Sequence, residues 1–181
     1  MPDAAPPLDL RSFIRDVPDF PQPGVLFRDI TPLLLDARAF RHAVDELTRH
    51  IAPLAPEAIV GVESRGFLFG APVALNLGLP FVPVRKAGKL PSERMSVEFA
   101  LEYGESQLDM HTDALRRGQQ VVIVDDLLAT GGTAKAATRL VELAGGHVRA
   151  LAFLVELTCL GGRERLREFE VIALVQYDGS S

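Results

Sequence analysis

The chain has little cysteine, no long apolar run and no excess of basic residues, and each shortage excludes a class of protein. The single cysteine, Cys159, excludes an internal disulfide and fits a reducing cytoplasm. Although 48% of the 181 residues are hydrophobic, no apolar run is long enough to span a membrane. A net charge of −5 disfavours nucleic acid as the main partner. The first residues carry proline and acid where a signal peptide would be basic and then apolar. We therefore expect a cytoplasmic protein with neither a nucleic acid nor a membrane as its partner.

Proline is missing from the second half of the chain. Nine of the 13 prolines fall between Pro2 and Pro56, and none follows Pro91. Because proline interrupts both helices and sheet ladders, the first third should be irregular and the second half regular. Asp36 is expected to cap a helix over residues 37–51. The length suits one domain, residues 1–181, with a substantial core.

What the chain does have is a strand, loop and helix in the stretch VVIVDDLLATGGT. The four apolar residues Val121 to Val124 predict a strand buried on both faces. Ala134, Ala137 and Val141 then recur at helical spacing, and a second apolar run follows over residues 148–155. This unit predicts an α/β fold with a central, mostly parallel sheet flanked by helices. Ligands of such sheets collect at the carboxyl ends of the strands, where this loop lies.

The residue types in this loop indicate a phosphorylated sugar. Gly131 and Gly132 let backbone N–H groups face a ligand, and a helix start favours an anion such as phosphate. Asp125 and Asp126 would repel that phosphate but could accept hydrogen bonds from a vicinal diol. Phosphate beside diol describes a ribose 5-phosphate. A purely structural turn, a receiver-type acidic pair and a nucleotide P-loop fit less well, the last because no lysine follows the glycines.

Two further loops are expected at the same edge of the sheet. Residues 59–62 predict a second buried strand, and Arg65 in the loop after it could grip a polyphosphate. A third predicted strand, residues 81–84, leads into the cluster Arg85, Lys86 and Lys89, a local anion site in an acidic chain. A solvated basic loop is the alternative there.

A charged hairpin is predicted between the third strand and the central stretch. Residues 97–101 alternate as a strand and residues 108–111 would form its return. A hairpin over about residues 86–111 is a plausible flexible lid for an active site. Glu102 is its acid–base candidate, provided that closure desolvates it, whereas His111 is more simply structural.

The central stretch resembles the phosphoribosyl pyrophosphate (PRPP) motif of class I phosphoribosyltransferases. Four further segments are similar to parts of the adenine phosphoribosyltransferase family. The hood is matched by PDFPQPGVLFRDITPLL and the pyrophosphate loop by ESRGFLFG. The lid region is matched by RKAGKLP and LEYG. The resemblance implies the class I fold with a hood over about residues 1–35 and a homodimer. It also implies transfer of phosphoribose from PRPP to adenine, with Mg²⁺ bound through PRPP oxygens rather than directly by protein ligands.

The same resemblance implies a role for each site residue. The catalytic residues would be Glu102, which exchanges a proton at purine N7, and Arg65. The 5-phosphate and ribose would be bound by Asp125, Asp126, Ala129, Thr130, Gly131, Gly132 and Thr133. Pyrophosphate would be bound by Glu63, Ser64, Gly66, Arg85, Lys86 and Lys89, with Tyr103 holding the lid. Adenine would be bound by Leu26, Phe27, Arg28 and Leu157.

Two alternatives to this interpretation stay open on the sequence. One is a class I transferase for another base, against which the hood sequence argues. The other is a non-catalytic PRPP-sensing regulator. Such a regulator should carry a nucleic-acid-binding segment, and neither a helix-turn-helix extension nor a basic region is visible in the sequence.

Overall fold

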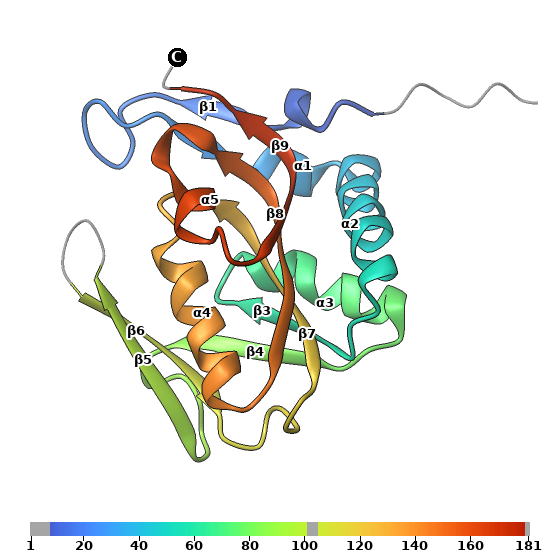
Figure 1. Ribbon diagram of the computed structural model, residues 1–181. Helices are drawn as coiled ribbons and strands as arrows, with labels where there is room; N and C mark the ends of the chain where they lie inside the picture. Colours follow the sequence, from blue (N-terminus) through green and yellow to red (C-terminus); the bar gives the residue numbers. More distant parts are fainter. Residues whose placement is uncertain (1–7, 101–104, 180–181) are drawn as a thin grey trace, which may run out of the picture.

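The computed structural model describes residues 8–100 and 105–179, and its centre is a seven-stranded sheet with helices on both faces (Figure 1). The strands are β1 (Arg15–Val17), β2 (Phe27–Asp29), β3 (Ala58–Val62), β4 (Phe81–Lys86), β5 (Arg94–Ala100), β6 (Glu105–His111), β7 (Gln120–Leu128), β8 (His147–Leu157) and β9 (Glu170–Tyr177). The α-helices are α1 (Thr31–Leu35), α2 (Ala37–Ile51), α3 (Gly66–Leu77), α4 (Gly132–Leu143) and α5 (Gly162–Arg165). Three short 3₁₀ helices are η1 (Leu10–Phe13), η2 (Ala52–Leu54) and η3 (Thr158–Leu160).

The strand order of the large sheet creates a switch point between β3 and β7. The order is β5-β6-β4-β3-β7-β8-β9, and the five strands from β4 to β9 in that order are parallel. The chain leaves β3 towards β4 on one side, whereas β7 lies on its other side. Loops at the carboxyl ends of two such strands diverge and leave a crevice, which is where ligands of open α/β sheets bind. The loops after β3 and β7 are two of the three loops that the sequence singled out at this edge of the sheet.

The β5–β6 hairpin adds two antiparallel strands beyond β4, and β1 and β2 form a separate antiparallel pair near the N-terminal end of the described chain. In Figure 1 the hairpin lies beside α4, and β1 lies beside β9. The predicted α/β fold, with its mostly parallel sheet, flanking helices and hairpin, is therefore confirmed. In the described residues, no helix combines the length and the apolar character needed to cross a membrane.

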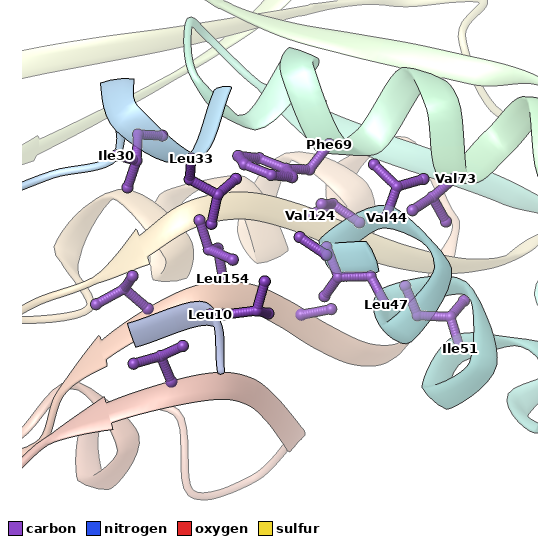
Figure 2. Close-up of a cluster of buried hydrophobic side chains, with 14 of the residues drawn as sticks. Leu10, Ile30, Leu33, Val44, Leu47, Ile51, Phe69, Val73, Val124 and Leu154 are labelled. Carbon is purple, nitrogen blue, oxygen red and sulfur yellow. The ribbon is translucent and has the colours of Figure 1, made fainter. Parts of the chain in front are cut away.

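Two apolar clusters, one on each face, hold the helices to the sheet. Figure 2 shows the cluster between α2, α3 and the sheet, where Leu47, Phe69 and Val124 are buried together. On the other face, α4 packs Ala137, Leu140 and Val141 against the sheet. Val121 to Val124 in β7 are all fully or almost fully buried, as the unbroken apolar run predicted.

Local signals placed α2 correctly. The Asp36 side chain accepts hydrogen bonds from the N–H groups of Arg38 and Ala39, each 2.9 Å long, and so caps the helix as expected. Val44, Leu47 and Ile51 are buried along one side of α2.

Several element boundaries differ from the prediction. The charged residues 161–169 predict one helix on sequence grounds, yet α5 covers only Gly162–Arg165, and turns follow it. A four-residue helix is too short to show a periodic apolar face, so the sequence pattern does not predict where it ends and tertiary packing determines its end. Strand β5 begins at Arg94, three residues earlier than predicted, because its pairing with β6 extends to His111. The short elements β1, β2 and α1 were not predicted.

Candidate functional site

The loops after β3 and β7 line a cavity of about 410 Å³ at the switch point. The loop after β3 contributes Glu63, Ser64 and Arg65. Strand β7 and the start of α4 contribute a continuous run of residues, 125–134. Lys86 completes the lining from β4, and Phe99, Ser106 and Leu108 line it from the hairpin. The sequence-predicted sugar, phosphate and pyrophosphate segments therefore meet at one place.

The α4 end of the cavity is built to receive an anion. Gly131 has a φ of +78°, a left-handed conformation that glycine adopts without strain, and it turns the chain into α4. Within the described residues, no side chain caps the N-terminus of α4. The N–H groups of the first helical turn thus have no intrahelical acceptor and lie at the cavity, with the positive end of the helix dipole.

The two aspartates of β7 both line the cavity. Asp126 is almost fully buried, and its Oδ2 forms an ion pair with Arg65 Nε at 2.5 Å. The N–H of Asp126 donates to Asp125 Oδ1 at 2.8 Å, which fixes the first carboxylate relative to the second. Burial raises the pKa of Asp125 well above its usual value, and the neighbouring charge of Asp126 raises it further. A carboxyl of this kind suits hydrogen bonding to neutral hydroxyls.

Close packing of two backbones holds the β3 loop against β7. A Cβ atom at Gly66 would lie 2.7 Å from the Val124 carbonyl oxygen and 2.9 Å from Asp125 Oδ1. Only glycine fits this contact, so Gly66 allows the Arg65 loop to approach the aspartates. The pyrophosphate role predicted for Gly66 stays a prediction, and the structure adds this close approach to β7.

The basic segment at the end of β4 is organised by Glu63. The carboxylate of Glu63 accepts two hydrogen bonds from the Arg85 guanidinium, at 3.3 and 3.2 Å, and one from the Lys86 N–H at 2.9 Å. Burial raises the pKa of Glu63, but these hydrogen bonds outweigh it and hold the pKa below its ordinary value. Arg85 also donates to the Lys89 carbonyl at 3.1 Å. Of the three predicted basic residues, Lys86 is the one that lines the cavity.

The hood residues lie beside the cavity rather than in its lining. The Arg65 guanidinium carbon is 5.8 Å from the centre of the Phe27 ring, so the loop after β3 joins the hood to the site. The Arg28 side chain is turned away, towards Asp16 and the Tyr177 ring. Leu157 ends β8, one strand beyond β7. Glu102 and Tyr103, assigned to the lid, lie outside the described residues.

Sequence reasoning did not assign Phe99, Ser106 or Leu108 to the site. Phe99 follows Val97 at the two-residue spacing of a strand, and this alternation indicates that one face of the hairpin is turned towards the protein. Which cavity that face lines depends on the pairing of β6 with β4, a contact that periodicity does not specify.

Metal donors in the cavity are few. Within the described part of the chain, no three histidine, cysteine or acidic side chains gather closely enough to hold a metal ion. The adjacent carboxylates of Asp125 and Asp126 are oxygen donors that line the cavity. Such a pair fits a hard cation that is held mainly by the oxygens of a phosphorylated ligand.

Comparisons with known proteins agree with this geometry. The family profile described as phosphoribosyl transferase domain matches residues 31–168. The chain is 56% identical to the adenine phosphoribosyltransferase of Carboxydothermus hydrogenoformans over 170 residues, which cover 94% of this chain and 100% of that protein. It resembles the crystal structure of the adenine phosphoribosyltransferase from Thermoanaerobacter pseudethanolicus, with a TM-score of 0.90 and 50% identity over 93% of this chain and 98% of that one.

A third relative was solved with bound ligands. The adenine phosphoribosyltransferase from Saccharomyces cerevisiae, complexed with adenine and an imino-altritol bisphosphate, matches with a TM-score of 0.86 and 40% identity. The match covers 91% of this chain and 96% of that chain.

Proposed function

This chain belongs to the adenine phosphoribosyltransferases of the phosphoribosyltransferase family, and we propose that it transfers phosphoribose from PRPP to adenine. The products are AMP and pyrophosphate. The observation that carries the proposal is the meeting of an uncapped helix start, two carboxylates and two basic residues around one cavity. Those groups match the phosphate, the diol and the pyrophosphate of PRPP, respectively.

The 5-phosphate lies at the start of α4. Backbone N–H groups of residues 129–133 donate to its oxygens, and the hydroxyls of Thr130 and Thr133 add further donors. These contacts are remote from ribose C1. Binding energy gained there orients the reacting carbon and does not itself break a bond.

The ribose hydroxyls donate to Asp125 and Asp126. Arg65 pairs with Asp126 in the structure, so PRPP binding replaces this one ion pair with two interactions to the ligand. The ribose diol takes the carboxylate, and the pyrophosphate takes the guanidinium. Both exchanged groups remain paired, so neither charge is left desolvated alone.

Cleavage of the bond between C1 and the pyrophosphate oxygen leaves positive charge on the sugar and negative charge on the leaving group. Arg65 and Lys86 stabilise the departing pyrophosphate, and Asp125 and Asp126 lie near the developing cation. Glu63 positions the basic segment through Arg85 and the Lys86 N–H. The remaining pyrophosphate contacts come from Ser64, Gly66 and Lys89. When bound, Mg²⁺ neutralises part of the charge on the pyrophosphate oxygens.

Adenine lies between the hood and the end of β8. Phe27 covers one face of the base and Leu157 the other, while backbone groups at Leu26 and Arg28 pair with its amino edge. The 5.8 Å separation between the Arg65 guanidinium and the Phe27 ring supports this position, because it puts the base beside the leaving-group side of the cavity. A backbone donor and acceptor at that edge would discriminate a 6-amino purine from a 6-oxo purine.

Glu102 exchanges the proton at purine N7 once the lid has closed, and Tyr103 helps to hold the lid. Glu102→Gln should lower kcat by about 100-fold or more, because it removes a general acid–base group, with little change in either substrate KM. Steady-state kinetics on both substrates measures this split. A wild-type kcat for Glu102→Gln would remove Glu102 from the proton transfer.

We also propose that the enzyme is a cytoplasmic homodimer that pairs through α3. Leu68 and Leu75, seven residues apart on one side of α3, are 40% and 80% exposed. Paired apolar side chains on one exposed helix face favour a second protein surface over water. Helix α3 begins directly after the Arg65 loop, so a partner there would lie next to the site.

Sedimentation of Leu75→Asp tests the dimer, with Leu143→Asp as the matched control. Leu143 is 63% exposed but lies on α4, on the opposite side of the sheet. We expect Leu75→Asp alone to be a monomer. A wild-type monomer, or a dimer that survives Leu75→Asp, would contradict the interface.

The catalytic proposal is tested by measuring AMP formation from adenine, PRPP and Mg²⁺, with hypoxanthine, guanine and xanthine as competing bases. We expect AMP and pyrophosphate in equal amounts, and no product from the 6-oxo purines. Faster turnover of a 6-oxo purine would reassign the base, and binding of PRPP without turnover of any base would indicate a regulator.

A further inference from the structure

An ion pair between a buried carboxylate and a partly exposed arginine lies outside the cavity, behind the loop that faces the 5-phosphate. Glu156, at the end of β8, is 1% exposed. Its carboxylate accepts from Arg163 Nε at 2.9 Å and from a terminal nitrogen of the same guanidinium at 2.5 Å. This is the two-bond, charge-assisted arrangement in which arginine binds carboxylate most strongly.

The ion pair ties three elements together. Gln176 of β9 donates to the same Glu156 carboxylate at 3.0 Å, and Arg163 donates to the Val171 carbonyl of β9 at 2.8 Å. Arg163 belongs to α5, so the short helix is fixed to β8 and β9 through one side chain. A four-residue helix has too few internal hydrogen bonds to hold its own position, and the ion pair supplies that constraint.

The start of α5 packs directly on the phosphate-facing loop. Gly162 lies so close to the Ala129 carbonyl that an added Cβ would collide with it. In the reverse direction, a Cβ at Gly131 would lie 2.9 Å from the Gly162 carbonyl oxygen. The contact is therefore backbone against backbone, and neither segment can shift without moving the other.

We propose that Glu156 and Arg163 are positioning residues for the 5-phosphate site, acting through Gly162 on the backbone of residues 129–131. The inference rests on the proposed function, since it takes the phosphate of PRPP as the ligand of that loop. Neither side chain lines the cavity. Their effect is to set the direction of the loop N–H groups, and a displacement of about 1 Å in such groups is costly.

The chain offers a matched control for Arg163. Arg167 lies four residues further on, and its ion pair with Glu164 joins two side chains that are 80% and 77% exposed. An exposed pair of this kind contributes little to structure. Arg163→Met and Arg167→Met therefore make the same chemical change, once opposite a buried carboxylate and once opposite an exposed one.

The experiment measures dissociation constants for ribose 5-phosphate and adenine separately by calorimetry, together with the KM of each substrate. Arg163→Met should weaken ribose 5-phosphate and PRPP by roughly 10- to 100-fold and leave adenine within about twofold. Arg163→Lys, which keeps the charge without the two-bond fork, should fall between Arg163→Met and wild type. Arg167→Met should match wild type.

A second variant tests the transmission step without touching the ion pair. Gly162→Ala places a methyl group against the Ala129 carbonyl and should give the same selective loss of ribose 5-phosphate. This variant also keeps the test available if Arg163→Met does not fold.

The outcomes separate the inference from the function. Equal losses for adenine and ribose 5-phosphate, or unchanged ribose 5-phosphate binding by Arg163→Met and Gly162→Ala, would overturn the positioning role alone. A wild-type chain that binds no ribose 5-phosphate would overturn the proposed function and the inference with it.

Discussion

At the scale of single residues, the ion pair between Arg65 and Asp126 joins two groups that we assign to opposite ends of one ligand. The guanidinium serves the pyrophosphate and the carboxylate serves the ribose. Asp126 is nearly buried, whereas the Arg65 side chain is 43% exposed. The arginine is thus the more exposed partner, and we expect ligand binding to move Arg65 rather than Asp126.

Asp126→Asn should damage PRPP binding selectively. The amide keeps the shape of the carboxylate but loses its charge, so a charge-assisted hydrogen bond to the diol, about 1.5–3 kcal/mol, is lost. Titration calorimetry should report PRPP binding weakened by roughly 10- to 150-fold, with adenine binding unchanged. Asp45→Asn, an exposed site on α2 outside the cavity lining, is the control. PRPP binding equal to wild type would refute the diol assignment.

Residue identities predicted the chemistry of the site better than they predicted which side chains contact one another. Asp125, Asp126 and Arg65 all line the cavity that the sequence indicated. The partner of Glu63, by contrast, is Arg85, 22 residues along the chain on a neighbouring strand. No local pattern contains that pairing, because it depends on the register of β3 against β4.

At the scale of elements, strong periodic signals were predictive and short elements were not. Strand β7 has an unbroken apolar run that is buried on both faces, helices α2 and α4 each bury one periodic apolar face, and all three lie where the sequence predicted them. Strands β1 and β2 have three residues each, too few to show an alternation. Their pairing is instead fixed by side chains, including the ion pair of Arg15 with Asp29 across the two strands.

Asp29 makes the stability of the hood depend on pH in the acid range. Hydrogen bonds from the Thr31 hydroxyl and N–H, followed by that from Arg15, lower the Asp29 pKa from 3.8 to about 2. A carboxylate with a lowered pKa stabilises the folded state above its unfolded pKa. That contribution is lost as the pH falls from 3.8 through about 2.

Asp29→Asn should therefore destabilise the protein near neutral pH by about 1–2 kcal/mol and have less effect below about pH 3. Urea unfolding followed by circular dichroism across the acid range measures the difference between variant and wild type. Asp113→Asn, in the exposed turn after β6, should show no such convergence. A constant difference at every pH would mean that Asp29 acts through shape and not through its charge.

At the scale of the whole molecule, the hood is closed onto the opposite end of the chain. The Tyr177 ring, in the last strand, lies between two guanidiniums, with Arg28 at 3.9 Å and Arg11 at 4.4 Å from its centre. Arg28 follows Phe27, so the ring that we assign to adenine is held in place from β9. A contact between residues about 150 positions apart leaves no trace in local sequence patterns, which is why the hood could be recognised but not positioned.

Tyr177→Leu should weaken adenine binding while PRPP binding stays close to wild type. The change removes two cation–π contacts, each about 0.5–2 kcal/mol, and frees the hood from β9. Tyr177 also pairs with Leu157 in the parallel register of β8 and β9, so both proposed covers of the base depend on it. We expect the KM for adenine to rise about tenfold or more, whereas the loop before α4, on the other side of β8, keeps its geometry. Tyr177→Phe retains an aromatic ring and should behave as wild type. If PRPP and adenine weakened together in Tyr177→Leu, the hood would be part of the common folding core and not a separate support for the base.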